Sequence, residues 1–210
     1  MTNRNILTND ADVEFALSEL IKIEPRFAKA LQLVGIPELR TRDHGFRALF
    51  KIIVGQKLSV AAANAIWFRL DSSGVTNSEK LLSCNDEVLR SLGLSKTKIA
   101  YSKGLALKNL NYDQMMEYSD KDISEKLQSI KGIVEWTVQI YLMFSLGRAD
   151  IFAAGDLALR EAIRNIFQME TRPSSANVIS IAEKWKPFRS VAALLLWKYY
   201  GFLKNNKDLI

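Results

Sequence analysis

Two features of the chain combine residue types and a spacing that could do chemistry on a nucleic acid. The first is Ile130-Lys131-Gly132-Ile133, a short segment between two helical patterns. Glycine adopts turn geometries that other residues resist, and the N-terminus of a following helix attracts anions, so this hairpin could hold one phosphate beside Lys131. The second is Asp156, a carboxylate further along the chain that directly follows Gly155. A phosphate-binding hairpin followed by a single carboxylate is typical of a protein that binds DNA and reacts with it.

Each feature also has a purely structural explanation. The hairpin could be an ordinary corner between two helices, and aspartate is a favoured N-cap for the helix predicted over 157–167. The helix between the two features favours a chemical role because it carries Trp136, Tyr141 and Phe144. Aromatic side chains near one carboxylate suit a cationic or electron-poor nucleobase. We therefore predict that Asp156 is catalytic and that the three aromatic residues line a base pocket.

The elements that must position these residues are predicted to be helices. Apolar residues recur with helical spacing along nearly the whole chain, and no run alternates long enough to require a sheet. We expect an all-α protein of roughly ten short helices. The last of them is expected to begin at Pro187 and to end at Gly201. Trp67 and Trp197 lie at helical spacing among apolar residues, which predicts core packing for both.

Capping residues predict where several helices begin. Ser59, Ser95 and Ser174 each precede a helical pattern that a serine side chain can cap. Asp120 or Asp122 is expected to cap the helix before the hairpin. The buried set of the helix after Ser95 is predicted to be Ile99, Leu105 and Leu107.

Composition excludes several classes of protein. The 210 residues, 48% of them hydrophobic, are enough for a core, and no apolar run is long enough to span a membrane. The first residues lack the features of a secretory signal. Cys84 is the single cysteine, which excludes an internal disulfide, a four-cysteine zinc site and an iron–sulfur cluster and fits a cytoplasmic location. The net charge of +6 and the pI near 9.4 favour a polyanionic partner without proving one.

Three blocks of sequence resemble the helix-hairpin-helix DNA glycosylases in the same order: 46–63, 127–160, and 185–192 with Trp197. The resemblance is to the 3-methyladenine DNA glycosylase II branch, which removes alkylated bases. It implies two helical domains with the active site in the cleft between them. The middle domain, near 38–148, would hold the hairpin, and both chain ends, 1–37 with 149–210, would form the other. The chain looks like the compact form, without the N-terminal β-rich domain of larger relatives.

The resemblance also assigns residues to roles. Asp156 matches the family's catalytic aspartate, and Trp136 stands where bifunctional relatives carry the lysine that forms a Schiff base. A tryptophan cannot form one, so a monofunctional enzyme without lyase activity is implied. The loop from Gln56 matches the one that, in the family, fills the gap left by a flipped nucleotide. The predicted DNA-binding residues are Gln56, Lys57, Leu58, Ser59, Lys131, Gly132, Ile133, Val134 and Thr137.

The function implied by the resemblance is excision of alkylated purines, of the 3-methyladenine and 7-methylguanine class, from double-stranded DNA in base excision repair. Asp156 would stabilise the positive sugar as the N-glycosidic bond breaks, orient the attacking water, or do both. Trp136 would stack on the cationic base. We expect a monomer without a cofactor. An alkali cation could bridge phosphate to the hairpin carbonyls of Gln128, Ile130 and Ile133.

Two positions depart from the family pattern. Val134 replaces the second glycine of the hairpin, where it would resist a positive φ and crowd a phosphate. Ala153 and Ala154 stand where a proline usually precedes the aspartate. An alternative is therefore a helix-hairpin-helix DNA-binding protein with impaired catalysis. A third possibility is a helical scaffold that binds only protein.

Overall fold

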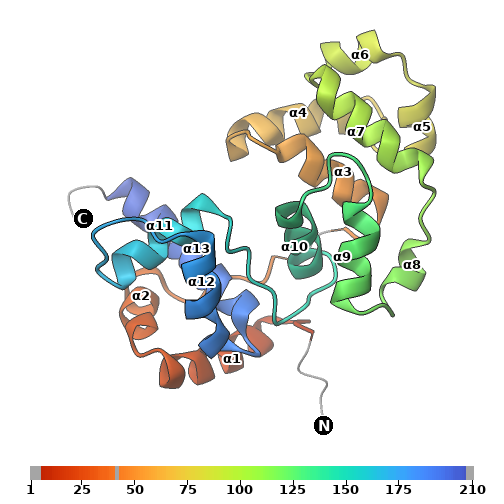
Figure 1. Cartoon of the computed structure of the whole chain (residues 1–210). Coiled ribbons are helices and arrows are strands. Elements are labelled where there is room, and N and C mark those ends of the chain that lie inside the picture. Colours follow the sequence, from red (N-terminus) through yellow and green to blue (C-terminus); the bar gives the residue numbers. More distant parts are fainter. Residues whose placement is uncertain (1–5, 41–42, 207–210) are drawn as a thin grey trace. The chain divides into compact units, whose positions relative to one another are not determined.

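The computed structural model describes residues 6–40 and 43–206. All regular elements in these ranges are helices (Figure 1). The one β-type pairing there is an isolated bridge between Ile6 and Arg148. The predicted all-α class is confirmed. No helix in the described ranges has the length and apolar character needed to cross a lipid bilayer.

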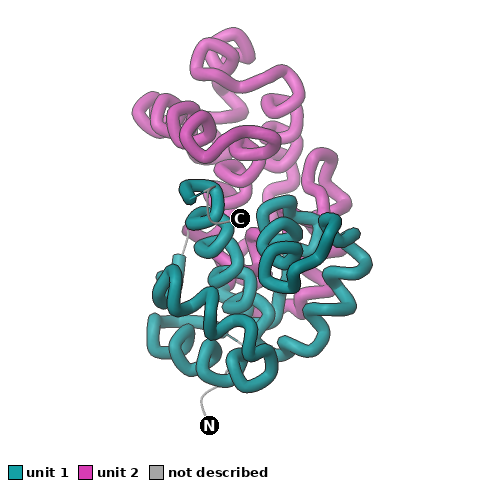
Figure 2. The backbone as a smooth tube through the Cα atoms, turned by 90° about the vertical axis from the view of Figure 1, so that its left-hand side faces the viewer, with its two compact units in different colours: residues 1–41, 147–210 teal, residues 42–146 magenta. Residues whose placement is uncertain are grey.

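The chain forms two compact units, drawn in different colours in Figure 2. We call Met1–Thr41 with Gly147–Ile210 the terminal unit, and Arg42–Leu146 the middle unit. The domain limits expected from the resemblance, 38 and 148, stay a prediction because compactness is not a test of independent folding. The terminal unit contains α1 (Asp10–Ile23), α2 (Arg26–Val34), α11 (Leu157–Ile166), α12 (Ser175–Ala182), the 3-10 turn η1 (Glu183–Trp185) and α13 (Arg189–Asn205). The middle unit contains α3 (Phe46–Gly55), α4 (Val60–Ser72), α5 (Ser78–Ser83), α6 (Asp86–Ser91), α7 (Lys96–Leu107), α8 (Tyr112–Met115), α9 (Asp120–Gln128) and α10 (Glu135–Phe144).

The terminal unit is built around α13, which packs against α1, α2 and α11. Its first two turns are buried almost completely because the run Val191–Leu196 is apolar on every side. Trp185, just before this helix, is fully buried, and its ring lies 5.0 Å from that of Phe27 and 5.4 Å from that of Phe152. This core holds the beginning of α11, where Asp156 lies.

The middle unit is built around α3, which packs against α4, α7 and α10. Five of its residues from Leu49 to Val54 are buried, as expected for an apolar helix enclosed by others. Phe50 and Trp67 join it to α4 through a ring contact of 5.6 Å. The same packing brings the end of α3 close to α7 and to the hairpin that precedes α10.

The predicted helix starts are mostly confirmed. Ser59, Ser95 and Ser174 each accept a hydrogen bond from a backbone amide in the first turn of the helix that follows. The prediction of an aspartate cap for α9 is wrong, because Ser119 is the N-cap. Its hydroxyl accepts from the amide of Asp122 and donates to the carboxylate of the same residue, which occupies the third helical position.

Two other predictions are corrected. Gly201 does not end the last helix, which begins at Arg189 and continues to Asn205. A glycine inside a helix costs about 1 kcal/mol relative to alanine, and burial of Tyr199 and Leu203 offsets that cost. Leu107 is exposed rather than buried, because it lies two positions after the buried Leu105 and therefore on the opposite face of α7.

Candidate functional site

Asp156 is the N-cap of α11, as expected for an aspartate that directly precedes a predicted helix. Its backbone has φ −69° and ψ 126°, outside the helical region. Its Oδ1 accepts hydrogen bonds from the amides of Ala158 at 2.9 Å and Leu159 at 3.1 Å. These are two of the amides that a helix leaves without intrahelical partners at its start, so the carboxylate is fixed at the positive end of the helix. The side chain is half-buried.

Trp197 contacts the same carboxylate oxygen from α13. Its indole Nε1–H donates to Oδ1 of Asp156 over 3.1 Å, and the residue is only half-buried. Core packing, the role predicted for Trp197, therefore does not describe it fully. Helical spacing indicates which face of α13 carries the indole, but not that α11 packs against this face. The one available signal was that Trp197 closes the third block of the family resemblance.

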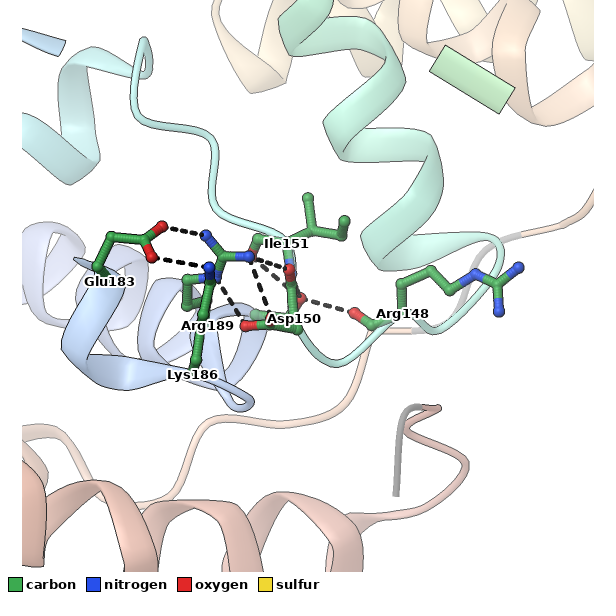
Figure 3. A network of polar contacts seen from close by, with 7 residues as sticks. Arg148, Asp150, Ile151, Glu183, Lys186 and Arg189 are labelled. Atoms are coloured by element: carbon green, nitrogen blue, oxygen red, sulfur yellow. Dashed lines mark hydrogen bonds and ion pairs between the residues drawn. The ribbon is translucent and has the colours of Figure 1, made fainter. Parts of the chain in front are cut away.

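The beginning of α13 holds the segment that leads to Asp156 (Figure 3). Arg189 donates from Nε to Oδ1 of Asp150 at 2.7 Å and from Nη2 to Oδ2 at 3.1 Å, and it also donates to Glu183. Ser190 donates to the carbonyl of Arg148 at 2.6 Å and accepts from the amide of Ile151 at 3.0 Å. One rigid helix thus fixes the chain at residues 148–151 and, two turns later, at Asp156. Arg189 is engaged within this network.

The turn before Asp156 has alanines where the family pattern has a proline, and it is held by burial and local hydrogen bonds. Ala153 is fully buried and Ala154 nearly so. The amide of Asp156 donates to the carbonyl of Ala153 at 2.9 Å, and that of Ala154 donates to Phe152 at 3.0 Å. Burial and these local hydrogen bonds supply the restraint that a proline ring would otherwise add.

The hairpin between α9 and α10 requires glycine at position 132. Gly132 has a φ of +94°, and a Cβ built there would lie 2.1 Å from Cγ of Tyr101. Any larger residue would therefore be strained and would collide with the ring. Ile133, predicted to bind DNA, is buried, whereas Lys131 is exposed.

Val134 occupies the N-cap of α10 in an ordinary conformation. Its φ of −99° and ψ of 166° are extended, a region that β-branched residues favour. The hairpin therefore does not need a second glycine for backbone reasons. The side chain is 57% exposed, so its apolar atoms stand at the start of α10, where a phosphate is predicted to approach.

The loop between α3 and α4 exposes some of the predicted DNA-binding residues to solvent, whereas the side chain of Gln56 is bonded within the protein. Lys57 and Leu58 are exposed, and Ser59 caps α4. The side-chain amide of Gln56 is instead bonded to the hairpin residues Gly132 and Thr137. Thr137 is fully buried. The structure therefore brings three predicted residues together as contacts within the protein.

The three predicted base-pocket residues differ in accessibility. Trp136 is half-buried, Phe144 is 9% exposed, and Tyr141 is fully buried. The hydroxyl of Tyr141 lies 3.0 Å from Nδ1 of His44 and accepts from the amide of Gly45 at 3.4 Å. Burial raises the pKa of Tyr141 to about 12. The hydroxyl of Tyr141 thus contacts the segment that precedes α3. Trp136 is the most accessible of the three aromatic rings.

The predicted cation ligands lie around the same turn. Gln128 ends α9, and Ile130 and Ile133 follow within the hairpin. The carbonyl of Ile130 accepts from the amide of Ile133 at 3.0 Å. This hydrogen bond closes the turn.

Comparison with known proteins agrees with this arrangement. Residues 50–188 match the model of the HhH-GPD superfamily of base excision DNA repair proteins. In Schizosaccharomyces pombe, the alkylbase DNA glycosidase-like protein mag2 is 28% identical over 91% of this chain and 96% of its own. DNA-3-methyladenine glycosylase 1 of the same yeast is 29% identical over 92% and 89%. The solved structure of S. pombe 3-methyladenine DNA glycosylase (Mag1) in complex with abasic DNA is 30% identical, with a TM-score of 0.81 over 87% of this chain and 95% of that one. The chain belongs to the HhH-GPD superfamily of base excision DNA repair proteins.

Proposed function

We propose that this protein is a monofunctional DNA glycosylase that hydrolyses the N-glycosidic bond of alkylated purines and leaves an abasic site. The relatives named as 3-methyladenine glycosylases cover nearly the whole chain and support this class of substrate. An alkylated purine carries positive charge on its ring and is already a good leaving group. The protein therefore needs to select such a base and to stabilise the sugar that remains.

The observation that carries the proposal is the way Asp156 is held. One carboxylate oxygen accepts three hydrogen bonds, two from the start of α11 and one from Trp197 on α13. Fixed in this way, the carboxylate does not reorient during the reaction. A preorganised negative charge stabilises the positive charge that develops on the deoxyribose as the bond to the base breaks. The base departs with the electron pair of the N-glycosidic bond, water adds to the positive sugar carbon, and the proton of that water is released to solvent, which leaves the abasic site.

Trp136 supports both base selection and the absence of lyase activity. Its indole is the most accessible of the predicted pocket aromatics and could stack on a cationic ring. A desolvated contact of this kind contributes on the order of 2 kcal/mol, which favours alkylated over normal bases. Trp136 also has no amine that could attack the sugar, so strand cleavage through a Schiff base is not expected.

DNA would be bound through the start of α10, with Lys131 exposed beside it. Amides at a helix N-terminus and a nearby ammonium group suit a phosphate. The lesion would leave the duplex at a cost of a few kcal/mol, which is smaller where alkylation has weakened pairing. Affinity should fall with salt, with a slope near −3 for about three phosphate contacts.

The test is excision from methylated duplex DNA by the wild-type protein and by the Asp156→Asn variant. Asparagine is as good an N-cap as aspartate, so the variant should fold and bind DNA. Release of 3-methyladenine and 7-methylguanine should fall by orders of magnitude, because the negative charge is lost. The matched control is Asp113→Asn, whose carboxylate is fully exposed, and it should change the rate by less than about twofold.

Three kinds of result would count against the proposal. Equal excision by Asp156→Asn would remove Asp156 from catalysis. If the wild-type protein binds the duplex but releases no base, the alternative of a DNA-binding protein with impaired catalysis would replace the enzyme. Strand breaks before alkali treatment, or a covalent adduct trapped by borohydride, would refute the absence of lyase activity.

A further inference from the structure

The loop after α3 places a lysine in a backbone conformation that is unfavourable for any residue other than glycine. Gln56 has φ −54° and ψ 129°, Lys57 has a φ of +58°, and the amide of Leu58 donates to the carbonyl of Gly55 at 3.2 Å. These features match a type II turn, in which glycine is the preferred residue at the position of Lys57. Lysine in the left-handed region persists only where the surroundings hold it there. The turn therefore needs a support outside its own four residues.

Gln56 provides that support. Its Nε2 donates one hydrogen bond to the carbonyl of Gly132 at 2.9 Å and another to Oγ1 of Thr137 at 3.0 Å. A primary amide has two N–H donors, and both are used here. The acceptors lie in the hairpin turn and in the first turn of α10. One side chain thus connects the loop to both parts of the hairpin.

The two acceptors cannot easily move. Thr137 is fully buried, and Gly132 lies against the ring of Tyr101 with no room for even a Cβ. Tyr101 belongs to α7, which also carries Lys98. Lys98 donates to the carbonyl of Val54 in the last turn of α3 at 2.6 Å, and burial lowers its pKa. Helix α7 therefore supports the end of α3 on one side and the hairpin on the other.

We propose that Gln56 is a positioning residue that locks the Gly55–Leu58 turn onto the hairpin, so that both present their exposed residues to DNA as one rigid unit. Gln56 then acts through Gly132 and Thr137 and not by touching DNA. Rigid coupling lowers the entropy lost when two separate segments bind one ligand. The inference rests on the proposed DNA binding, but it concerns a residue with no part in bond cleavage.

The experiment measures binding to a duplex that contains a tetrahydrofuran abasic-site analogue, by fluorescence anisotropy at one salt concentration. Gln56→Ala should weaken binding about tenfold, as expected for the loss of two hydrogen bonds that organise the interface. The matched control is Gln139→Ala, whose amide donates to Glu135 on the same helix, and it should change affinity by less than about twofold. Melting temperatures show that each variant is folded.

A double-variant cycle separates positioning from direct contact with DNA. Thr137→Val removes one acceptor of Gln56 at a buried site and keeps the volume of the side chain, so it should also weaken binding. The double variant Gln56→Ala/Thr137→Val should bind no more weakly than Gln56→Ala alone, because both changes break the same connection. Additive losses would overturn the positioning role, and so would wild-type affinity in Gln56→Ala. Failure of the wild-type protein to bind the duplex would instead refute the proposed function on which the inference rests.

Discussion

Replacing Trp197 by phenylalanine tests whether the hydrogen bond to Asp156 matters for catalysis. The substitution keeps an aromatic ring on α13 but removes the Nε1–H that lies 3.1 Å from Oδ1. The two amides of α11 remain as donors, so the carboxylate keeps its place at the N-cap and loses only the hydrogen bond from the indole. Loss of catalysis should therefore be partial, well short of that in Asp156→Asn.

The magnitude follows from the kind of hydrogen bond that is lost. A bond to a charged group contributes about 1.5–3 kcal/mol. If the whole of this free energy stabilises the transition state, its loss should lower the rate of base release roughly 10- to 150-fold. The site is half-buried, and water can replace part of the lost interaction, which favours the lower end of this range.

The assay is single-turnover release of 7-methylguanine at saturating protein, which isolates the chemical step from binding and product release. Trp67→Phe is the matched control, because Trp67 packs with Phe50 and Leu70 in the core of the middle unit. It should lower the melting temperature through lost packing while the rate stays within about twofold. An unchanged rate in Trp197→Phe, or an equal loss in Trp67→Phe, would refute a specific role for this hydrogen bond.

Two further predictions concern the middle unit. Lys57→Gly should raise the stability of the fold by a net ~0.5–1 kcal/mol, because relief of the left-handed backbone at φ +58° exceeds the extra unfolded-state entropy of glycine. The same variant should bind DNA more weakly, with a salt slope shallower by about one if Lys57 holds a phosphate; thermal unfolding and anisotropy titrations measure the two effects. The pKa of Tyr141 rises from about 10 in the unfolded chain to about 12 in the fold, so the folded state binds more protons in that interval. The stability from the neutral phenol is complete below pH 10 and is lost as the pH rises to about 12, and urea unfolding at several pH values should show a smaller loss for Tyr141→Phe.

Local sequence patterns were enough to predict the helical class and most helix starts. Capping depends on one side chain and the next few amides, so Ser59 and Ser174 could be assigned without tertiary information. The same holds for Asp156, whose local pattern predicted an N-cap and whose place in the family pattern predicted catalysis. Gly132 was also identifiable, because a hairpin between two helices calls for a residue that tolerates positive φ.

Long-range packing decided what local patterns could not. The end of α13 at Asn205 depends on burial of Leu203, which outweighs the local preference of Gly201 to stop a helix. Trp197 meets Asp156 only because α11 packs against α13. Gln56 bonds to Gly132 across a sequence separation of 76 residues, since α3 packs against both α7 and α10. Spacing along a chain predicts which way a side chain faces, whereas its partner depends on which elements share the core.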